Sequence, residues 1–513
     1  MAAVPSVPSF DEIRSKTFEY FNKRPCAWQV HICQEILHGD RDLISIAGTG
    51  MGKTLTFWMP LIFRPQGIQL VITPLNILGE QNTAILHRIG IEAIFISGTT
   101  AKPEIFQDIA SLRYRVVIAN PEELMREHGG FEMLLQDKIF NSHLISIIVD
   151  EAHCISQWGS FRSDYRDIGR LRLFQRKLCP ILATSATMST GVIEDVKKVL
   201  RLREESLFVS RCSTDRSNIA IIVRPIVNPI YSYRELSFVL GDWEPGNPPP
   251  PKFIVFFDNI KYSVDAGHYL RGLLPKDEQS CINWFNSDMS DEFKRSEAER
   301  FAHGETWGLL ATDSFGMGMD LPDIKLVVQY CAPTSISMLW QRFGRCVRDP
   351  SLNGIAILLA EKEYFDHLKN TTKKRKRGIT TKTEPGSTAK RAKVRPLSDP
   401  TNNLSRIDDV PLDDDEGDGE QEDDTDNEQD EDEDGDEERD EDGRKEMQKD
   451  RNKRTHGMKK SKKKSKKDQI EPAIIDLLNA GQRGLGCRRR IFTDTFQNSK
   501  AARWLSSLPS CSS

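Results

Sequence analysis

Short apolar runs, separated by stretches with helical spacing, recur along the first two thirds of the chain. The first series lies at residues 43–46, 70–72, 93–96, 116–118, 145–149 and 181–183. A second series lies at 253–257, 309–311, 326–328 and 355–359. Near-continuous apolar strands alternating with helices are typical of a parallel sheet covered on both faces. The pattern therefore predicts an α/β fold with two parallel-sheet domains in tandem and a cleft between them.

The same pattern places the domain boundaries. We expect a short N-terminal helical segment over residues 1–26, a first domain over 27–212 and a second domain over 253–368. Between the domains, residues 224–252 include four consecutive prolines at 248–251 and are predicted to form a semi-rigid linker.

After residue 369 the composition changes abruptly. Residues 1–370 hold 40 of the 71 Lys and Arg and 44 of the 76 Asp and Glu, so 31 basic and 32 acidic residues fall in the shorter remainder. Residues 413–443 alone contain 22 acidic side chains, flanked by basic clusters at 373–377, 390–393 and 459–467. Such a tract buries too little apolar surface to offset its ordering entropy. We predict that 370–468 is disordered and that 469–513 is too short for a core of its own.

Composition narrows the class of protein. Ten cysteines form no CxxC pair and no regular spacing, which predicts a reducing compartment without a disulfide framework. No apolar run approaches the roughly 18 residues that a membrane span needs. We therefore expect a soluble intracellular protein. The first 370 residues are nearly neutral, so any site for a polyanion must be a local groove.

A glycine-rich turn follows the apolar run at 43–46. Its residues are Gly48, Thr49, Gly50, Met51, Gly52, Lys53 and Thr54, preceded by Ala47 where such loops usually carry a glycine. Glycines let backbone N–H groups surround phosphates, the lysine charge meets the β- and γ-phosphates, and the threonine hydroxyl binds Mg²⁺. The turn predicts a site for a nucleoside triphosphate; by itself it is also compatible with a plain strand-to-helix crossover.

A second cluster follows the buried run at 145–149. Asp150 is expected to hold Mg²⁺, directly or through water, and Glu151 to orient and deprotonate the attacking water. Farther on come Gln341, Arg345 and Arg348. The two arginines are three residues apart, which predicts that they share one helix face. Arginines delivered from an opposing domain stabilise the charge of phosphoryl transfer.

In this order the motifs resemble superfamily 2 helicases, and more narrowly the RecQ family of DNA helicases. The narrower resemblance rests on residues 150–159, Asp-Glu-Ala-His-Cys-Ile-Ser-Gln-Trp-Gly, continuing into Phe161-Arg162 and Asp164-Tyr165, and on 315–318, Phe-Gly-Met-Gly. It covers residues 12–366. It implies two RecA-like domains, ATP and Mg²⁺ as cofactors, single-stranded and tailed duplex DNA as partners, and 3′→5′ unwinding in DNA repair or recombination.

The resemblance also assigns residues. Gln29, with the segment before it, corresponds to the adenine-recognising motif. Lys53, Asp150, Glu151, His153, Gln341, Arg345 and Arg348 correspond to the ATPase set. Trp158, Phe161 and Arg162 correspond to a loop that senses single-stranded DNA, and their rings and guanidinium suit stacking on unpaired bases. Core packing is the plainer alternative for Trp158.

The sequence departs from the family after the second domain. Cys487-Arg488-Arg489 through Phe496 resembles the start of the family's zinc module, but only Cys511 follows. Too few ligands remain for a four-cysteine site, so we expect no bound zinc.

Two rival functions remain open: an RNA-dependent ATPase or helicase, and a non-catalytic nuclear interaction protein, in which a decayed core carries an acidic–basic tail that binds histones or nucleic acid. The basic clusters at 373–377 and 390–393 suit nuclear import, although solvated linker charge is the alternative.

Overall fold

The computed structural model describes residues 6–159, 162–175, 178–315, 321–349, 351–368 and 469–497. The predicted tail at 370–468, Phe161, the stretch 316–320 and Cys511 lie outside these ranges. The described helical residues include no helix long and apolar enough to cross a bilayer.

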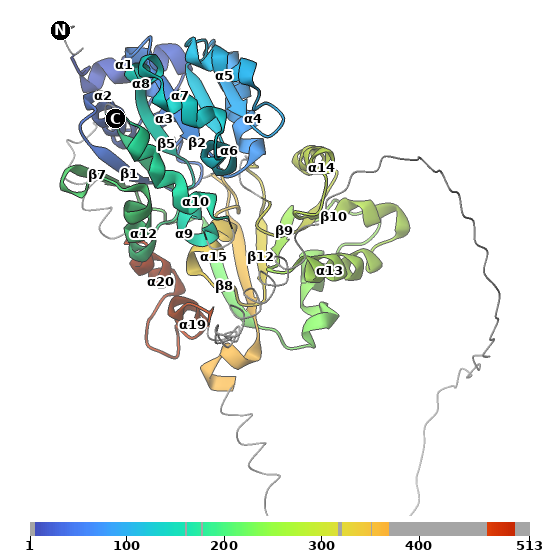
Figure 1. Ribbon diagram of the computed structural model, residues 1–513. Helices are drawn as coiled ribbons and strands as arrows, with labels where there is room; N and C mark the ends of the chain where they lie inside the picture. Colours follow the sequence, from blue (N-terminus) through green and yellow to red (C-terminus); the bar gives the residue numbers. More distant parts are fainter. Residues whose placement is uncertain are drawn as a thin grey trace, which may run out of the picture. The chain divides into compact units, whose positions relative to one another are not determined.

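The first domain contains seven strands, all paired in parallel, in the order β3-β4-β2-β5-β6-β1-β7. Figure 1 labels β1, β2, β5 and β7 of this sheet. They are β1 Asp42–Ile46, β2 Ile68–Ile72, β3 Ala93–Ile96, β4 Val116–Ala119, β5 Leu144–Val149, β6 Ile181–Ser185 and β7 Leu207–Arg211. All residues of β1, β2, β4 and β6 are buried, as expected for a sheet covered on both faces.

Helices on the two faces of this sheet form separate cores. One face packs against α2 (Ala27–His38), α3 (Leu55–Phe63) and α4 (Asn76–Arg88), and α1 (Phe10–Phe21) packs outside α2 and α3. The other face packs against α5 (Pro103–Ala110), α6 (Pro121–Met125), α7 (Gly130–Gln136), α8 (Lys138–His143), α9 (Cys154–Trp158), α10 (Asp164–Asp167), α11 (Leu171–Phe174) and α12 (Thr190–Leu200). Because the strands are parallel, their carboxyl ends lie at one edge of the sheet, and the loops there carry the predicted site residues.

The second domain has six parallel strands in the order β10-β11-β9-β12-β13-β8. They are β8 Ile219–Pro225, β9 Phe253–Phe256, β10 Ile282–Phe285, β11 Gly308–Ala311, β12 Leu326–Tyr330 and β13 Gly354–Ala360. Its principal helices are α13 (Ile260–Gly272), α14 (Asp291–His303) and α15 (Ile336–Phe343). Both domains are thus the predicted parallel-sheet α/β units.

The predicted linker at 224–252 differs from the structure. Strand β8 pairs along its whole length with β13, so the second domain begins at Ile219. Leu236 and Val239, in a 3₁₀ helix within 224–252, are buried in the core beside β9. A linker was predicted because of the four prolines at 248–251. In the structure, the apolar residues on either side of them pack onto the sheet.

The segment 469–497 also packs on the second domain. Its helices α19 (Pro472–Leu478) and α20 (Arg488–Thr495) bury Ile474, Leu477 and Phe492 in the core that contains α14 and α15. This C-terminal helical segment shares the second domain's core instead of building one of its own.

Candidate functional site

The phosphate loop, residues 47–54, joins β1 to α3. Gly50 and Gly52 have φ values of 82° and 74°, in the left-handed region that glycine adopts without a Cβ penalty. A Cβ on Gly52 would lie 3.0 Å from Nε2 of Gln29. That amide, from the buried side chain of Gln29 on α2, donates to the Gly52 carbonyl at 2.8 Å, while its oxygen accepts from the Cys26 amide at 2.7 Å. The adenine-motif glutamine therefore supports the phosphate loop.

Lys53 lies at the centre of the charged groups. Its Nζ donates to the carbonyls of Ala47 at 3.1 Å and Gly48 at 3.4 Å. Burial lowers the pKa of this ammonium, opposed by the charges of Glu151 and Asp150 and reinforced by those of Arg345 and Arg348. Residues from both domains thus act electrostatically on one lysine. Thr54 is the N-cap position of α3, where its hydroxyl suits a phosphate-bound cation.

The two carboxylates follow β5 and titrate as a pair. Burial, and then the charge of Glu151, raise the pKa of Asp150 to about 7. Burial also acts to raise the pKa of Glu151, but the hydrogen bond and charge of His153 and the charges of Lys53 and Arg345 outweigh it, so this pKa lies well below its usual range. Glu151 is therefore ionised at neutral pH, as a general base requires. Asp150 has a half-buried carboxyl that a divalent cation would keep ionised, which fits a Mg²⁺ ligand.

Glu151 also has an unusual backbone. Its φ of 47° lies in the left-handed region, which non-glycine residues adopt rarely and which is enriched at functional sites. Its amide donates to the Asp150 carboxylate at 2.9 Å. The tight turn directs consecutive carboxylates toward the same site.

A polar relay connects Glu151 to the second domain. His153 Nδ1 lies 3.2 Å from the Glu151 carboxylate and 2.8 Å from the Ser185 hydroxyl. That hydroxyl accepts from the Thr187 amide at 3.1 Å, and the Thr187 hydroxyl accepts from Gln341 Nε2 at 2.5 Å. Gln341 is on α15, so the relay crosses between the domains. Of the predicted residues, it joins Glu151, His153 and Gln341.

The prediction that Arg345 and Arg348 share a helix face is wrong. Helix α15 ends at Phe343, and both arginines lie in the arginine turn, residues 344–349, where Val347 has a φ of 34°. The turn nevertheless faces the first domain: a Cβ on Gly344 would lie 3.9 Å from the Thr49 hydroxyl of the phosphate loop. Burial and the neighbouring Arg348 lower the pKa of Arg345 to about 9, and Glu151 opposes this shift.

The predicted DNA-sensing residues lie beside this relay. Trp158 ends α9, is half-buried and packs edge-to-face on Tyr165 with ring centroids 6.0 Å apart. The Arg162 guanidinium lies 5.2 Å from the Trp158 ring centroid and 5.0 Å from that of Tyr165. Trp158 also lines a small cavity together with His153, Gln341 and Arg345. Trp158 therefore contacts the same cavity as members of the ATPase set.

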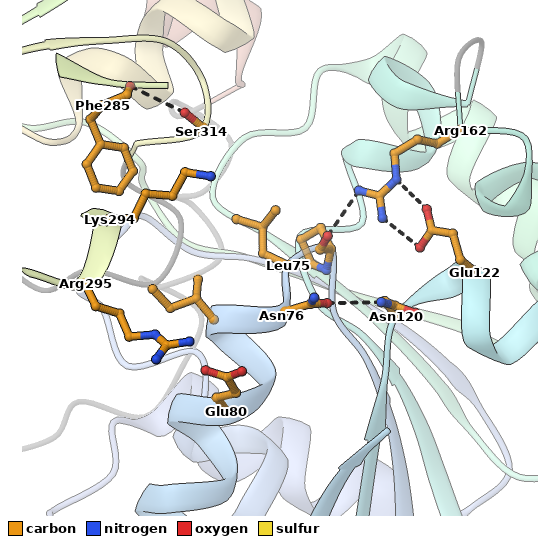
Figure 2. A pocket seen from close by; sticks show the side chains of 12 residues that line it. Leu75, Asn76, Glu80, Asn120, Glu122, Arg162, Phe285, Lys294, Arg295 and Ser314 are labelled. Carbon is orange, nitrogen blue, oxygen red and sulfur yellow. Dashed lines mark hydrogen bonds and ion pairs between the residues drawn. The ribbon is translucent and has the colours of Figure 1, made fainter. Parts of the chain in front are cut away.

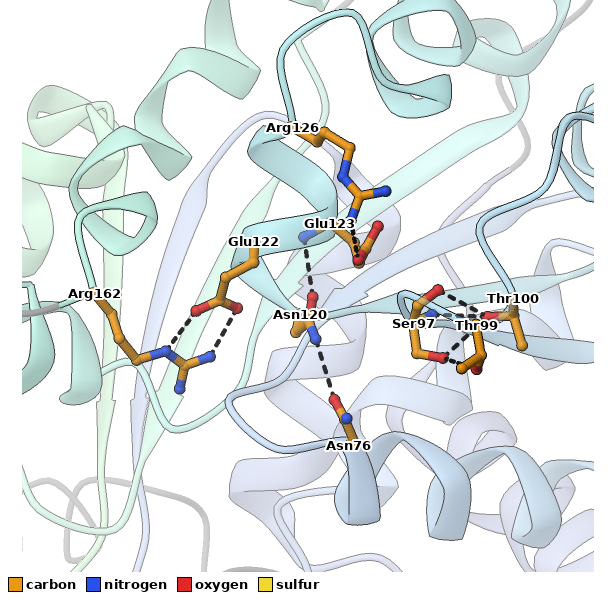
Figure 3. Close-up of polar contacts among 9 residues, drawn as sticks. All are labelled: Asn76, Ser97, Thr99, Thr100, Asn120, Glu122, Glu123, Arg126 and Arg162. Atoms are coloured by element: carbon orange, nitrogen blue, oxygen red, sulfur yellow. Dashed lines mark hydrogen bonds and ion pairs between the residues drawn. The ribbon is translucent and has the colours of Figure 1, made fainter. Parts of the chain in front are cut away.

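The Arg162 guanidinium forms its hydrogen bonds with other groups of the protein. Its Nε and Nη2 donate to the two carboxylate oxygens of Glu122 at 2.5 and 2.7 Å (Figures 2 and 3). Its Nη1 donates to the Pro74 carbonyl at 3.1 Å. This bidentate pair fixes the loop that carries Trp158 to the carboxyl edge of the first sheet. The geometry assigns Arg162 a positioning role in this conformation.

A cavity of about 390 Å³ lies between the two domains. On the first domain its lining includes Leu75, Asn76, Asn120, Glu122 and Arg162, and on the second domain Phe285, Lys294, Arg295 and Ser314. Figure 2 shows Lys294 and Arg295 extending from the second domain toward the first, with Arg295 beside Glu80, which also lines the cavity. The two cations and the amide side chains of Asn76 and Asn120 are groups that suit a phosphate backbone.

Polar side chains continue along the carboxyl edge of the first sheet (Figure 3). Asn120 caps α6 by accepting from the Glu123 amide at 3.0 Å, and its Nδ2 donates to Asn76 at 3.1 Å. After β3, the Thr100 hydroxyl accepts from the Ser97 amide at 2.7 Å and donates to the Phe95 carbonyl at 2.9 Å. These bonds hold the loops of an extended polar surface.

Several residues of the site were missed by the sequence analysis. Lys294 and Arg295 lie in a helix of mixed charge, where no spacing singles them out. Thr187 ends the stretch Thr-Ser-Ala-Thr at 184–187, and its hydroxyl just after a buried strand is a signal that could have indicated a contact at this edge of the sheet. Arg342, adjacent to the assigned Gln341, is buried and donates to Asp258 at 2.6 Å and Asp313 at 2.9 Å, inside the second domain.

Comparisons with known proteins agree with this architecture. Residues 26–196 match the DEAD/DEAH box helicase model and residues 244–349 match the helicase conserved C-terminal domain. The chain is 28% identical over 351 residues to the bifunctional 3′-5′ exonuclease/ATP-dependent helicase WRN of Mus musculus, covering 68% of this chain and 24% of that protein. It is 27% identical over 351 residues to the RecQ-like DNA helicase blm-1 of Caenorhabditis elegans, covering 66% and 33%.

A protein of Acanthamoeba polyphaga mimivirus, named as a candidate ATP-dependent RNA helicase, is 28% identical over 336 residues, covering 65% of this chain and 57% of that protein. The chain thus spans between a quarter and three fifths of these relatives. Among solved structures, the helicase MrfA bound to DNA and AMPPNP has a TM-score of 0.55 at 18% identity, over 72% of this chain and 53% of that one, a likeness of fold. Two parallel-sheet domains and the two matching models identify the chain as one that contains the DEAD/DEAH box domain and the conserved C-terminal domain of a helicase, and the chain is similar to a RecQ-like DNA helicase over 66% of its length.

Proposed function

We propose that this protein is an ATP-dependent DNA helicase that moves 3′→5′ on single-stranded DNA and unwinds duplex DNA. The observation that supports it most is the convergence of Lys53, Glu151 and Arg345, from two domains, on one charged site. No single-domain binding role requires an ionised carboxylate beside arginines from a second domain, whereas cleavage of a triphosphate does.

Each of the site residues has a separate role in the proposed hydrolysis. The phosphate loop and Lys53 would bind the triphosphate, with Thr54 and Asp150 holding Mg²⁺, which neutralises phosphate charge when bound. Glu151 accepts the proton of the attacking water, and His153 holds the Glu151 carboxylate in place. Arg345 and Arg348 stabilise the charge that develops on the transferring phosphoryl group. Because these arginines belong to the second domain, binding would draw the domains together and hydrolysis would release them.

The nucleic acid would lie across both domains. The cavity with Lys294 and Arg295 and the polar edge near Asn76 and Asn120 offer contacts suited to phosphates. Phosphate contacts carry little sequence information, so we expect weak base preference and strong salt dependence. Relatives named DNA helicases favour DNA, while the viral relative named for RNA keeps an RNA helicase as the second candidate.

A strand-displacement assay tests the proposal. With ATP and Mg²⁺, the full chain should displace the strand of a 3′-tailed duplex and not of a 5′-tailed one, and Lys53→Ala should displace neither. ATPase stimulation by single-stranded DNA should exceed that by RNA of the same sequence. Absent ATPase activity with both nucleic acids would overturn the proposal and favour the non-catalytic interaction protein. Stronger stimulation by RNA would select the second candidate.

We also propose a nuclear location, a role in DNA repair or recombination, and protein partners for the acidic tract. The nuclear proposal rests on the basic clusters at 373–377 and 390–393. Replacing the lysines and arginines of both clusters should move a fluorescently tagged full chain out of the nucleus, and unchanged nuclear signal would contradict this assignment.

A further inference from the structure

The arginine turn is held by a side chain that none of the helicase motifs contains. Arg216, between β7 and β8, donates to the carbonyls of Val347 at 2.6 Å, Cys346 at 3.3 Å and Gly344 at 3.4 Å. Asn218 adds bonds to Val347 at 3.2 Å and Leu352 at 2.9 Å. These donors bond the backbone immediately around Arg345 and Arg348, so they determine where both guanidinium groups point.

Arg216 is in turn held by the C-terminal helical segment. Arg489, in the first turn of α20, donates to the Arg216 carbonyl at 2.8 Å and to the Asp215 carboxylate at 2.7 Å, and it also donates to the Ile219 carbonyl. The Asp215 carboxylate accepts from the Arg216 amide at 2.9 Å. One guanidinium therefore fixes the backbone on both sides of Arg216.

A second contact supports the same connection. Phe492, one turn after Arg489, stacks on Trp340 with ring centroids 4.4 Å apart and an interplanar angle of 31°. The Trp340 indole donates to the Thr214 carbonyl at 3.1 Å. Helix α20 thus contacts both the connection between the domains and the end of α15 that leads into the arginine turn.

The segment also reaches the first domain. Arg211, the last residue of β7, donates to the Phe496 carbonyl at 2.9 Å, and Gln497 donates to Thr190, the first residue of α12, at 2.7 Å. The C-terminal helical segment therefore contacts the first domain, the connection at 212–218 and the second domain. This segment therefore links the first domain to the second domain next to the connection that holds the arginine turn.

We propose that Arg489 is a positioning residue for ATP hydrolysis: through Asp215 and Arg216 it sets the arginine turn so that Arg345 and Arg348 reach the phosphates. This inference rests on the proposed ATPase function. It gives the segment after the charged tract a role in turnover. It also explains why residues 100 positions beyond the second domain return to pack there.

The test compares variants of the full chain. Arg489→Ala should lower kcat of DNA-stimulated ATPase roughly tenfold, because misplaced catalytic groups lose rate steeply. Affinity for a fluorescent ATP analogue, which the phosphate loop and Gln29 determine, should stay within about twofold. Arg483→Ala is the matched control: Arg483 pairs with Asp366 at 2.7 Å and Asp476 at 2.7 Å, away from the connection, so its kcat should match wild type.

A variant that lacks both arginines of the turn separates positioning from general destabilisation. Because Arg489 acts through Arg345 and Arg348, Arg345→Ala/Arg348→Ala/Arg489→Ala should be no slower than Arg345→Ala/Arg348→Ala. Additive losses, a normal kcat in folded Arg489→Ala, or an equal loss in Arg483→Ala would overturn the proposal. Should Arg489→Ala fail to fold, Arg489→Lys takes its place, since the single nitrogen of an ammonium cannot take both positions from which the two guanidinium nitrogens bond their acceptors here.

Hydrogen exchange supplies a readout independent of activity. Arg489→Ala should speed exchange at the amides of 345–347 while leaving the phosphate loop unchanged, and unchanged exchange at 345–347 would contradict the proposal. A wild-type chain without ATPase activity would refute the proposed function, while this exchange measurement would still decide whether Arg489 holds the turn.

Discussion

The two halves of the candidate ATPase site are built by different means. The phosphate loop is contiguous: glycines at positive φ, Lys53 and a supporting amide from Gln29 make it almost complete within one strand-to-helix connection. The arginine turn follows a helix that has already ended, and it is held by Arg216 and Asn218 from a distant part of the chain. One half is encoded locally, whereas the other depends on tertiary contacts.

Removing the lysine of the local half should have the largest effect. Lys53→Ala deletes the only side-chain cation of the phosphate loop, so we expect ATPase activity to fall by at least about a thousandfold. Nucleotide affinity should fall as well, because the phosphate loop itself is proposed to bind the triphosphate. Phosphate release and equilibrium binding measure the two losses. Retained DNA-stimulated turnover would break the assignment of this loop.

Removing an arginine of the distant half should separate binding from turnover. Arg345→Ala should lower kcat by roughly a hundred- to a thousandfold while ATP affinity changes little, because the guanidinium acts on charge that develops during transfer. Single-turnover hydrolysis gives the rate and a fluorescent analogue gives the affinity. Equal losses in the hydrolysis rate and in ATP affinity would mean that the arginine turn contributes to binding as the phosphate loop does, against the proposed difference.

The relay between the halves can be tested at Trp158, which lines the same small cavity as His153, Gln341 and Arg345. Trp158→Ala should leave basal hydrolysis near wild type and reduce stimulation by single-stranded DNA roughly tenfold. Trp158→Phe keeps an aromatic ring and is the matched control. Full stimulation of the alanine variant would remove Trp158 from DNA sensing.

The smallest effect concerns pH and stability. The pKa of Asp150 is raised from 3.8 to about 7, so between these values the folded protein binds more protons than the unfolded chain. Stability contributed at this site therefore falls as pH rises through that window. Without Mg²⁺ or nucleotide, the Tm advantage of Asp150→Asn over wild type should grow by roughly 3 °C between pH 5.5 and 7.5. A difference that does not change with pH would contradict the raised pKa.

This contrast also explains what sequence could predict. Strands β1 and β5 and the loops after them were predictable because apolar runs and the residues that follow them are adjacent in the chain. Lys53, Asp150 and Glu151 needed only that local order, and the structure places all three together. Gln341 was assigned by resemblance, and its bond to Thr187 follows from the docking of the two domains.

The errors arose where distant contacts decide the structure. An i, i+3 spacing predicted a helix through Arg345 and Arg348, but bonds from Arg216 and Asn218 hold that backbone in a turn. Prolines predicted a linker where β8 instead completes the second sheet. The C-terminal helical segment builds no core of its own, as expected, but its place in the second domain's core could not be predicted because its partners, Trp340 and Phe343, are more than a hundred residues away.

The return of the chain to the second domain has a topological consequence. The Asp366 amide donates to Asn479 at 2.7 Å, and the Ile336 amide donates to Glu471 at 2.9 Å, so the two ends of the stretch 369–468 are anchored on the same body. The chain on either side of this stretch is therefore held by contacts that do not depend on the stretch itself. A single cut between residues 369 and 468 should yield two fragments that remain assembled through α19 and α20. Changing the length of the stretch should then leave the candidate ATPase site intact, because closure entropy rises only slowly with length.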